Sequence, residues 1–244
     1  MHWTRVATPM RKAVSPQVLV AQTSGKSTYM RLLDATRATN EAYALRNGFD
    51  YLAATGLFAG DQERHATFNK VFLLEAALAD GRYDVLFSLD SDALVVNASL
   101  SPSDFLPHNG TLLAACRGAS NVPHTWDVNA GVLIWNLRHP HVRAVSREWV
   151  ERSLRAIGRG TNNDQAELHT ILHRLTPRER EEWLNVYVGE EAGLFNYDGV
   201  HVKHFIRPDG GDWTGNTVPA RAREIEAFVR ARGPAAGLAG GGGR

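Results

Sequence analysis

Short, continuous apolar runs alternate along this chain with longer segments whose apolar residues recur at helical spacing. Residues 17–23 form one such run and predict a strand, and the helical spacing that follows ends at Gly48. Residues 49–54 predict a second strand, and a helical pattern from Glu63 ends at Gly81. Two successive strand–helix units are typical of an α/β fold with a parallel sheet.

The third apolar run leads directly into a pair of carboxylates. Residues 84–89 are apolar at nearly every position, as expected of a central strand that is covered on both faces, and Asp90-Ser91-Asp92 follows at once. In extended chain, side chains two positions apart point to the same side, so we expect both carboxylates to face one crevice. In open, mostly parallel sheets, ligands bind beyond the carboxyl ends of the strands.

The second half of the chain continues this pattern less regularly. We expect strands at 112–116, 128–135 (interrupted by Asn129-Ala130-Gly131), 185–188 and 200–206, and helices at 142–157, 163–175, from Thr176-Pro177, and at 219–232. The pattern predicts one α/β domain, residues 16–233, with a mostly parallel central sheet flanked by helices. Residues 1–15 are then an N-terminal extension, and the glycine-rich residues 234–244 a disordered tail.

Composition narrows the class of protein. With 244 residues, 43% hydrophobic and 22% charged, the chain fits a single compact domain. Its net charge is +1 and its basic residues are scattered, so neither nucleic acid nor an anionic membrane is expected as a partner. No apolar stretch approaches the roughly 18 residues of a membrane span, and the first residues lack the apolar run of a signal peptide. The Golgi lumen and the cytoplasm both remain open as compartments.

Asp90 and Asp92 are the strongest candidates for chemistry. An acid-x-acid triplet by itself is more often a solvated loop. Here, however, an apolar strand ends in two like charges, which repel one another unless a cation pairs them. Two carboxylates suit Mg²⁺ or Mn²⁺, which fills its remaining coordination positions with phosphate oxygens and water. We therefore expect a divalent metal site that faces a diphosphate.

The residues around this pair resemble a known family. Residues 82–97, RYDVLFSLDSDALVVN, look like the strand and DxD motif of the retaining GT-A galactosyl- and xylosyltransferases. Three further segments resemble parts of these enzymes. Phe68-Asn69-Lys70-Val71 resembles their helix with a lysine near the donor, and Asn129-Ala130-Gly131-Val132 resembles their N-x-G segment under the sugar. Asn163-Asp164-Gln165 resembles their D-Q pair.

A last segment resembles the glycogenin-like transferases. His204-Phe205-Ile206, with Gly210, Gly211 and Trp213, is similar to their H-F-x-G-x-x-K-P-W signature, whose histidine completes the metal site. Gly211 and Asp212 replace the proline and lysine of that signature, which puts the basic contact to the diphosphate in doubt, and Arg207 could substitute for it.

The resemblance implies a GT-A (Rossmann-like) fold and a glycosyltransferase. Such an enzyme moves a hexose or pentose from a nucleotide-diphosphate sugar, with a UDP-sugar favoured, to a hydroxyl of a carbohydrate or glycoconjugate acceptor, with retention of configuration. The resemblance implies that Mn²⁺ or Mg²⁺ is bound by Asp90, Asp92 and His204. It implies that the nucleotide-sugar is contacted by Thr23, Lys70, Asp90, Asn129 and Gly131. The residues implied at the reacting face are Asp164 and Gln165.

Each companion residue also has a purely structural interpretation. A histidine in an apolar run, such as His204, is often a packed core residue, and His201, expected on the opposite face, is the rival ligand. Asn129 and Gly131 can form a bulge. The remaining candidates fit ordinary helix positions: Asp164 and Gln165 at a helix start, and Lys70 as a solvated lysine.

Three other functions compete with the glycosyltransferase. Ser24-Gly25-Lys26-Ser27-Thr28 reads like the second half of a phosphate-binding P-loop, although Val20 stands where the first glycine is needed, which predicts an NTPase or kinase only weakly. A phosphatase would use Asp90 as nucleophile and Asp92 as acid/base, although Leu94 replaces its usual threonine. A non-catalytic sugar- or nucleotide-binding module is the third alternative.

Overall fold

The computed structural model describes most of the chain. The described residues are 2–6, 16–27, 29–107, 110–118, 124–161, 163–188, 193–195, 199–206 and 218–233. The predicted tail, and the segment that holds Arg207, Gly210, Gly211, Asp212 and Trp213, lie outside them.

A seven-stranded sheet forms the centre of the molecule, in the order β1-β3-β2-β4-β7-β6-β8. Its strands are β1 (His2–Val6), β2 (Val18–Ser24), β3 (Asp50–Thr55), β4 (Val85–Asp90), β6 (Leu113–Arg117), β7 (Val128–Asn136) and β8 (Leu184–Tyr187). β2, β3, β4, β6 and β8 run in one direction, and β1 and β7 run against it. The predicted α/β class with a mostly parallel sheet is confirmed.

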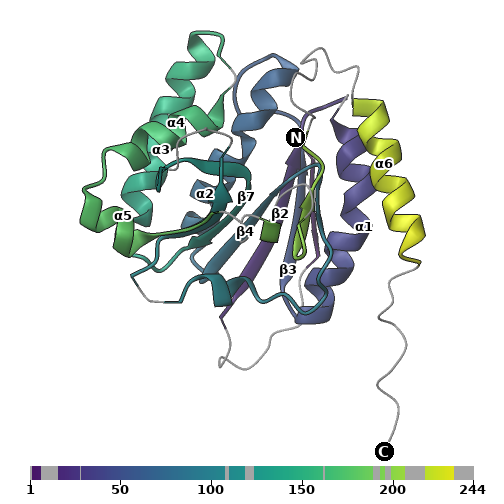
Figure 1. The fold of residues 1–244 in the computed structure, drawn as a ribbon. Helices are drawn as coiled ribbons and strands as arrows, with labels where there is room; N and C mark the ends of the chain where they lie inside the picture. Colours follow the sequence, from purple (N-terminus) through teal and green to yellow (C-terminus); the bar gives the residue numbers. More distant parts are fainter. Residues whose placement is uncertain are drawn as a thin grey trace, which may run out of the picture.

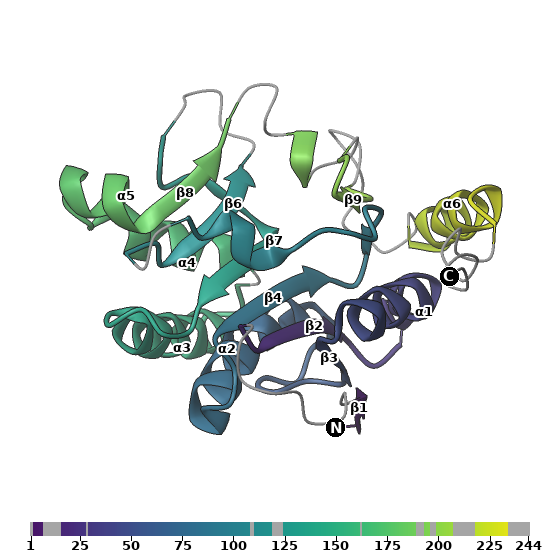
Figure 2. The same cartoon turned by 90° about the horizontal axis from the view of Figure 1, so that it is seen from below.

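Helices cover both faces of this sheet (Figures 1 and 2). They are α1 (Met30–Asn47), α2 (Asn69–Asp80), α3 (Val142–Gly158), α4 (Asp164–His173), α5 (Pro177–Trp183) and α6 (Val218–Ala231), with 3-10 turns η1 (Glu63–Phe68) and η2 (Pro102–Phe105). α1 and α6 pack together on one face, and α2, α3 and α4 lie on the other. Among the described residues, no helix is both long and apolar enough to span a membrane.

The apolar runs are explained by burial on both faces. Leu19 and Ala21 of β2 pack with α2 and α3, whereas Val18 and Val20 pack with Leu33 of α1. Because side chains alternate along a strand, a sheet covered on both sides needs apolar residues at every position.

The predicted helix boundaries follow from local chemistry. Gly48 and Gly81 adopt left-handed backbone with φ of 70° and 71°, which ends α1 and α2 as expected. Thr176 accepts a hydrogen bond from the Glu179 amide while Glu179 accepts one from the Thr176 amide, so the predicted cap of α5 is confirmed.

Other expectations need correction. Ser91 and Asp92 form a turn between β4 and β5 (Ala93–Val95), not the extended chain that we expected. β7 is continuous through Asn129-Ala130-Gly131, but its pairing with β6 is irregular there, as expected, because Ala115 pairs with Leu133 and Arg117 with Val128. Part of the predicted extension, His2–Val6, pairs with β3 as strand β1, which adds an edge strand to the sheet.

A second, two-stranded sheet lies beside the carboxyl end of β4. β5 pairs antiparallel with β9 (Val202–His204), so that Ala93 lies opposite His204. This pairing brings two segments together that are far apart in the sequence.

Candidate metal and donor site

The two carboxylates lie where β4 ends. Asp90 is the last residue of β4 and is half-buried, and Asp92 is buried in the turn that follows. Thr23, near the end of β2, is the register partner of Asp90, so this predicted donor residue lies at the same edge of the sheet. The carboxyl ends of neighbouring parallel strands thus meet here, as the sequence predicts.

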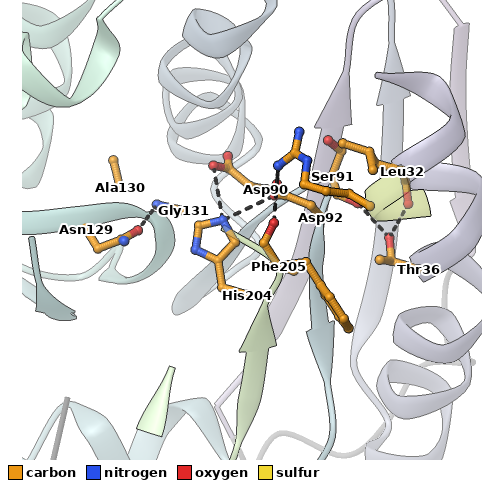
Figure 3. A network of polar contacts seen from close by, with 12 residues as sticks. Leu32, Thr36, Asp90, Ser91, Asp92, Asn129, Ala130, Gly131, His204 and Phe205 are labelled. Atoms are coloured by element: carbon orange, nitrogen blue, oxygen red, sulfur yellow. Dashed lines mark hydrogen bonds and ion pairs between the residues drawn. The ribbon is translucent and has the colours of Figure 1, made fainter. Parts of the chain in front are cut away.

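His204 reaches the carboxylates through the small sheet. The Phe205 amide donates to the Asp92 carbonyl over 3.0 Å, which fixes the end of β9 against the turn. The His204 Nε2 atom lies 3.2 Å from Asp92 Oδ1 and 3.9 Å from Asp90 Oδ2. One ligand atom from each of the three residues lies within 4.8 Å of the others (Figure 3).

His201 lies elsewhere, as expected for the opposite face. Its Nδ1 atom is 2.9 Å from the side-chain Nδ2 atom of Asn97, and its ring packs beside Phe105 and Phe195. The structure therefore gathers His204, and not His201, with the carboxylates.

Gly131 makes room for the imidazole. A Cβ atom at this position would lie 2.0 Å from Cε1 of His204, so no other residue fits without displacing the ring. The Asn129 side chain accepts a hydrogen bond from the Gly131 amide over 2.8 Å. The predicted N-x-G segment therefore lies against the metal-ligand candidates.

Lys70, near the start of α2, is buried among acceptors. Its Nζ atom lies 2.6 Å from Asp90 Oδ1 and 3.2 Å from Asp164 Oδ2, and it donates to the Ala130 carbonyl over 2.9 Å. Burial by itself lowers the pKa of Lys70, but Asp164 and Asp90 outweigh it, and the pKa is raised. Lys70 is therefore a fixed positive charge, and the solvated-lysine interpretation is wrong.

Asp164 and Gln165 begin α4, as the structural interpretation also predicts. Asn163 caps the helix by accepting from the Ala166 amide. Burial raises the pKa of Asp164, with Lys70 opposing and Asp90 adding to the shift. Gln165 Oε1 accepts from the Ala130 amide over 3.0 Å, so Gln165 and Lys70 hold the peptide groups on the two sides of Ala130.

Arg221 is a site residue that the sequence analysis missed. It is buried on α6, its Nη1 atom pairs with Asp92 Oδ2, and it donates to the Phe205 carbonyl over 3.2 Å. Burial raises the pKa of Asp92, but His204 and Arg221 outweigh this effect and lower the pKa to about 2. The sequence carries no motif for Arg221, because only the packing of α6 brings it to the turn.

The P-loop-like segment is occupied by a side chain of the protein itself. The amides of Lys26 and Ser27 donate to the Glu63 carboxylate over 3.0 and 3.1 Å. A Cβ atom at Gly25 would lie 2.1 Å from Glu63 Oε1. The amides that a P-loop would offer to a phosphate thus bind a carboxylate, which argues against the NTPase alternative.

The side chains at the site fit a divalent cation. Two carboxylates and an imidazole are suitable ligands for Mn²⁺ or Mg²⁺. The Nδ1 atom of His204 is buried and has no hydrogen-bond partner among the described residues. Lys70 pairs with Asp90 and Asp164, and Arg221 pairs with Asp92, so the protein's own cations hold these carboxylates in place.

Comparisons with known proteins agree with this architecture. In sequence, no protein-family model and no curated protein matches the chain. In structure, it resembles a glycosyltransferase involved in the glycosylation of the major capsid of PBCV-1, with a TM-score of 0.61 and 15% identity over 87% of this chain and 100% of that one. It also resembles the apo form of the glycosyltransferase GlyE of Streptococcus pneumoniae TIGR4, with a TM-score of 0.50 and 14% identity over 89% of this chain and 64% of that one. At such identities the likeness concerns the fold, and the chain has the GT-A-like fold of these glycosyltransferases.

Proposed function

We propose that this chain is a metal-dependent glycosyltransferase. It transfers a sugar from a nucleotide-diphosphate sugar to a hydroxyl group of a carbohydrate or glycoconjugate. The observation that carries the proposal is the gathering of Asp90, Asp92 and His204 at the carboxyl end of β4, within a fold shared with glycosyltransferases. A UDP-sugar donor, a hexose or pentose as the transferred sugar, and retention of configuration follow from the resemblance of the DxD segment.

The three ligand candidates would hold Mn²⁺ or Mg²⁺ at the carboxyl end of β4. Such an ion, when bound, stabilises the negative charge that develops on a departing diphosphate. Thr23 is the register partner of Asp90, and we assign it to the nucleotide. Lys70 keeps Asp90 and Asp164 in place through its ion pairs.

The reacting face is assigned to the start of α4 and of β7. Gln165 and Lys70 fix the peptide groups on the two sides of Ala130, which orients Asn129 and Gly131 beside the site. Asp164, held by Lys70, lies at the amino end of α4. We assign the sugar to this region, under Asn129 and Gly131 and next to Asp164 and Gln165.

The decisive experiment is donor hydrolysis by the purified chain. We expect a panel of UDP-sugars with Mn²⁺ to give release of UDP, and we expect a chelator to abolish it. Asp92→Asn should eliminate the release, because it removes the anionic ligand and keeps the size of the side chain. It also leaves the buried Arg221 without its carboxylate, so circular dichroism checks that the variant is folded in the assay. Undiminished hydrolysis in chelator-treated enzyme would contradict the proposal, and the configuration of the product, followed by NMR, tests retention.

A further inference from the structure

One face of α1 carries a row of four polar side chains, Thr36, Asn40, Tyr43 and Asn47. Their spacing of three or four residues places them on the same side of the helix. We call them the α1 polar row.

Each member of the row donates a hydrogen bond to a backbone carbonyl in the segment that follows Asp90. The bonds are Thr36 Oγ1 to Ser91 O (2.9 Å), Asn40 Nδ2 to Ala93 O (2.9 Å), Asn47 Nδ2 to Ala98 O (2.9 Å) and Tyr43 Oη to Leu100 O (2.8 Å). The helix therefore follows this segment over its length. The bonds to Ser91, Ala93 and Leu100 are buried, where a backbone carbonyl needs a donor, whereas Ala98 is exposed.

The first two members of the row contact the backbone at the metal-ligand candidates. Thr36 and Asn40 are completely buried. Thr36 bonds to Ser91, which lies between the two carboxylates (Figure 3). Asn40 holds the next peptides from both sides, because it donates to Ala93 O and accepts from the Val95 amide over 2.8 Å.

Gln22 of β2 extends this network to Asp90. Its Nε2 atom donates to the Asp90 carbonyl over 3.0 Å and to Thr36 Oγ1 over 3.2 Å. Its own carbonyl oxygen accepts from the Tyr51 hydroxyl over 2.8 Å, which fixes the orientation of the amide. The peptides on both sides of the turn are thus held by side chains that are themselves held.

We propose that Gln22, Thr36 and Asn40 are positioning residues for the cation site, acting through the backbone of Asp90, Ser91 and Ala93, which surrounds Asp92. This inference rests on the proposed function and goes beyond it, since none of the three side chains touches the ligand atoms. Loss of a partner that orients a metal ligand typically lowers metal affinity about 10- to 100-fold. Tyr43 and Asn47, which hold the far end of the segment, contribute to stability alone.

The test compares two ends of one helix. Thr36→Val keeps the shape of the side chain but removes the hydroxyl, which leaves the Ser91 carbonyl unpaired. We expect its Kd for Mn²⁺, measured by EPR of the free ion in a titration of the protein, to rise about tenfold or more. Thr36→Ser restores the hydroxyl and should recover most of the affinity.

Tyr43→Phe is the matched control, because it removes a buried donor from the same face of α1. We expect it to lower the unfolding temperature as Thr36→Val does but to leave the Mn²⁺ affinity unchanged. Equal Mn²⁺ affinities in these two variants would overturn the positioning role. If Thr36→Val does not fold, Gln22→Met, which removes the donor to the Asp90 carbonyl, gives the same comparison.

The outcome also separates this inference from the proposed function. A wild-type chain that does not bind Mn²⁺ and releases no UDP contradicts the glycosyltransferase itself. A wild-type chain that binds Mn²⁺, together with a Thr36→Val variant that binds it equally well, contradicts the positioning role alone.

Discussion

Gly131 contributes to the site by having no side chain. Gly131→Ala places a Cβ atom at a point that lies 2.0 Å from Cε1 of His204, and the far end of a side chain can move whereas β7 cannot. We therefore expect the imidazole to be displaced from Asp92, with weaker Mn²⁺ binding and lower UDP release from a protein that remains folded. EPR titration and the hydrolysis assay measure the two effects.

Gly158→Ala is the control for this substitution. A Cβ atom at Gly158, the last residue of α3, meets no atom within 4 Å. If Gly131→Ala and Gly158→Ala bind Mn²⁺ equally, then His204 does not depend on the space that Gly131 leaves.

The ion pair between Arg221 and Asp92 predicts in which direction Mn²⁺ changes the stability of a variant. Arg221→Met leaves the buried Asp92 carboxylate without its cationic partner, and breaking a buried pair on one side costs about 3–5 kcal/mol. A bound cation would then take over part of the charge compensation. We expect Mn²⁺ to raise the unfolding free energy of Arg221→Met more than that of the wild type, as measured by urea denaturation.

Arg223→Met serves as the comparison on the same helix, because Arg223 is exposed. We expect little loss of stability and no change in the response to Mn²⁺. A similar loss in both variants would mean that Arg221 acts through the packing of α6 and not through Asp92.

At the scale of elements, the sequence predicts what depends on neighbours in the chain. Gly48 and Gly81 end their helices because the left-handed backbone is a local preference, and the apolar run of β4 reports burial on both faces. The order of the motifs also placed Asp90 and Asp92 at the carboxyl end of a central strand.

The remaining features depend on contacts between distant segments. Thr36 and Asn40 read as ordinary polar helix residues, because the sequence does not show which face of α1 meets the segment after β4. Arg221 looks like one of several arginines of an amphipathic helix, and only the packing of α6 buries it. His204 is assigned through a resemblance, because β9 is too short for its alternation of apolar and polar residues to show which side chains face the site.

The turn between β2 and α1 gives a prediction against the P-loop alternative. Lys26 is exposed, its backbone amide is bound to Glu63, and its ammonium group has no role in the site that we propose. We expect Lys26→Met to leave UDP release unchanged. We also expect Glu63→Ala, which frees the Lys26 and Ser27 amides beside Thr23, to raise the KM for the donor. Loss of activity in Lys26→Met, accompanied by ATP hydrolysis in the wild type, would favour the NTPase.

At the scale of the whole molecule, the site joins both layers of helices to the sheet. Its residues come from the strands β4 and β9, from α2 on one face of the large sheet and from α6 on the other face. A cation that binds only the folded chain stabilises it by mass action, about 2.7 kcal/mol at a hundred times its Kd. We expect Mn²⁺ to raise the unfolding temperature in a concentration-dependent manner, as differential scanning calorimetry would show.

Asp92→Asn should remove this rise in unfolding temperature. Asp104→Asn, which changes an exposed carboxylate in η2, should retain it. A rise of equal size in both variants would show that Mn²⁺ acts on the protein surface in general.

The small β5–β9 sheet has a consequence for the order in which the protein is made. Asp92 and His204 are 112 positions apart, and Asp92 and Arg221 are 129 positions apart. A ribosome that adds about 5–20 residues per second delivers every strand of the large sheet before it delivers β9 and α6. The acidic turn therefore emerges, and β4 can take its place in the sheet, while the imidazole and the guanidinium have not yet been synthesised. A nascent chain thus has its scaffold first, and the residues of the proposed cation site come together only when its last described helix has left the ribosome.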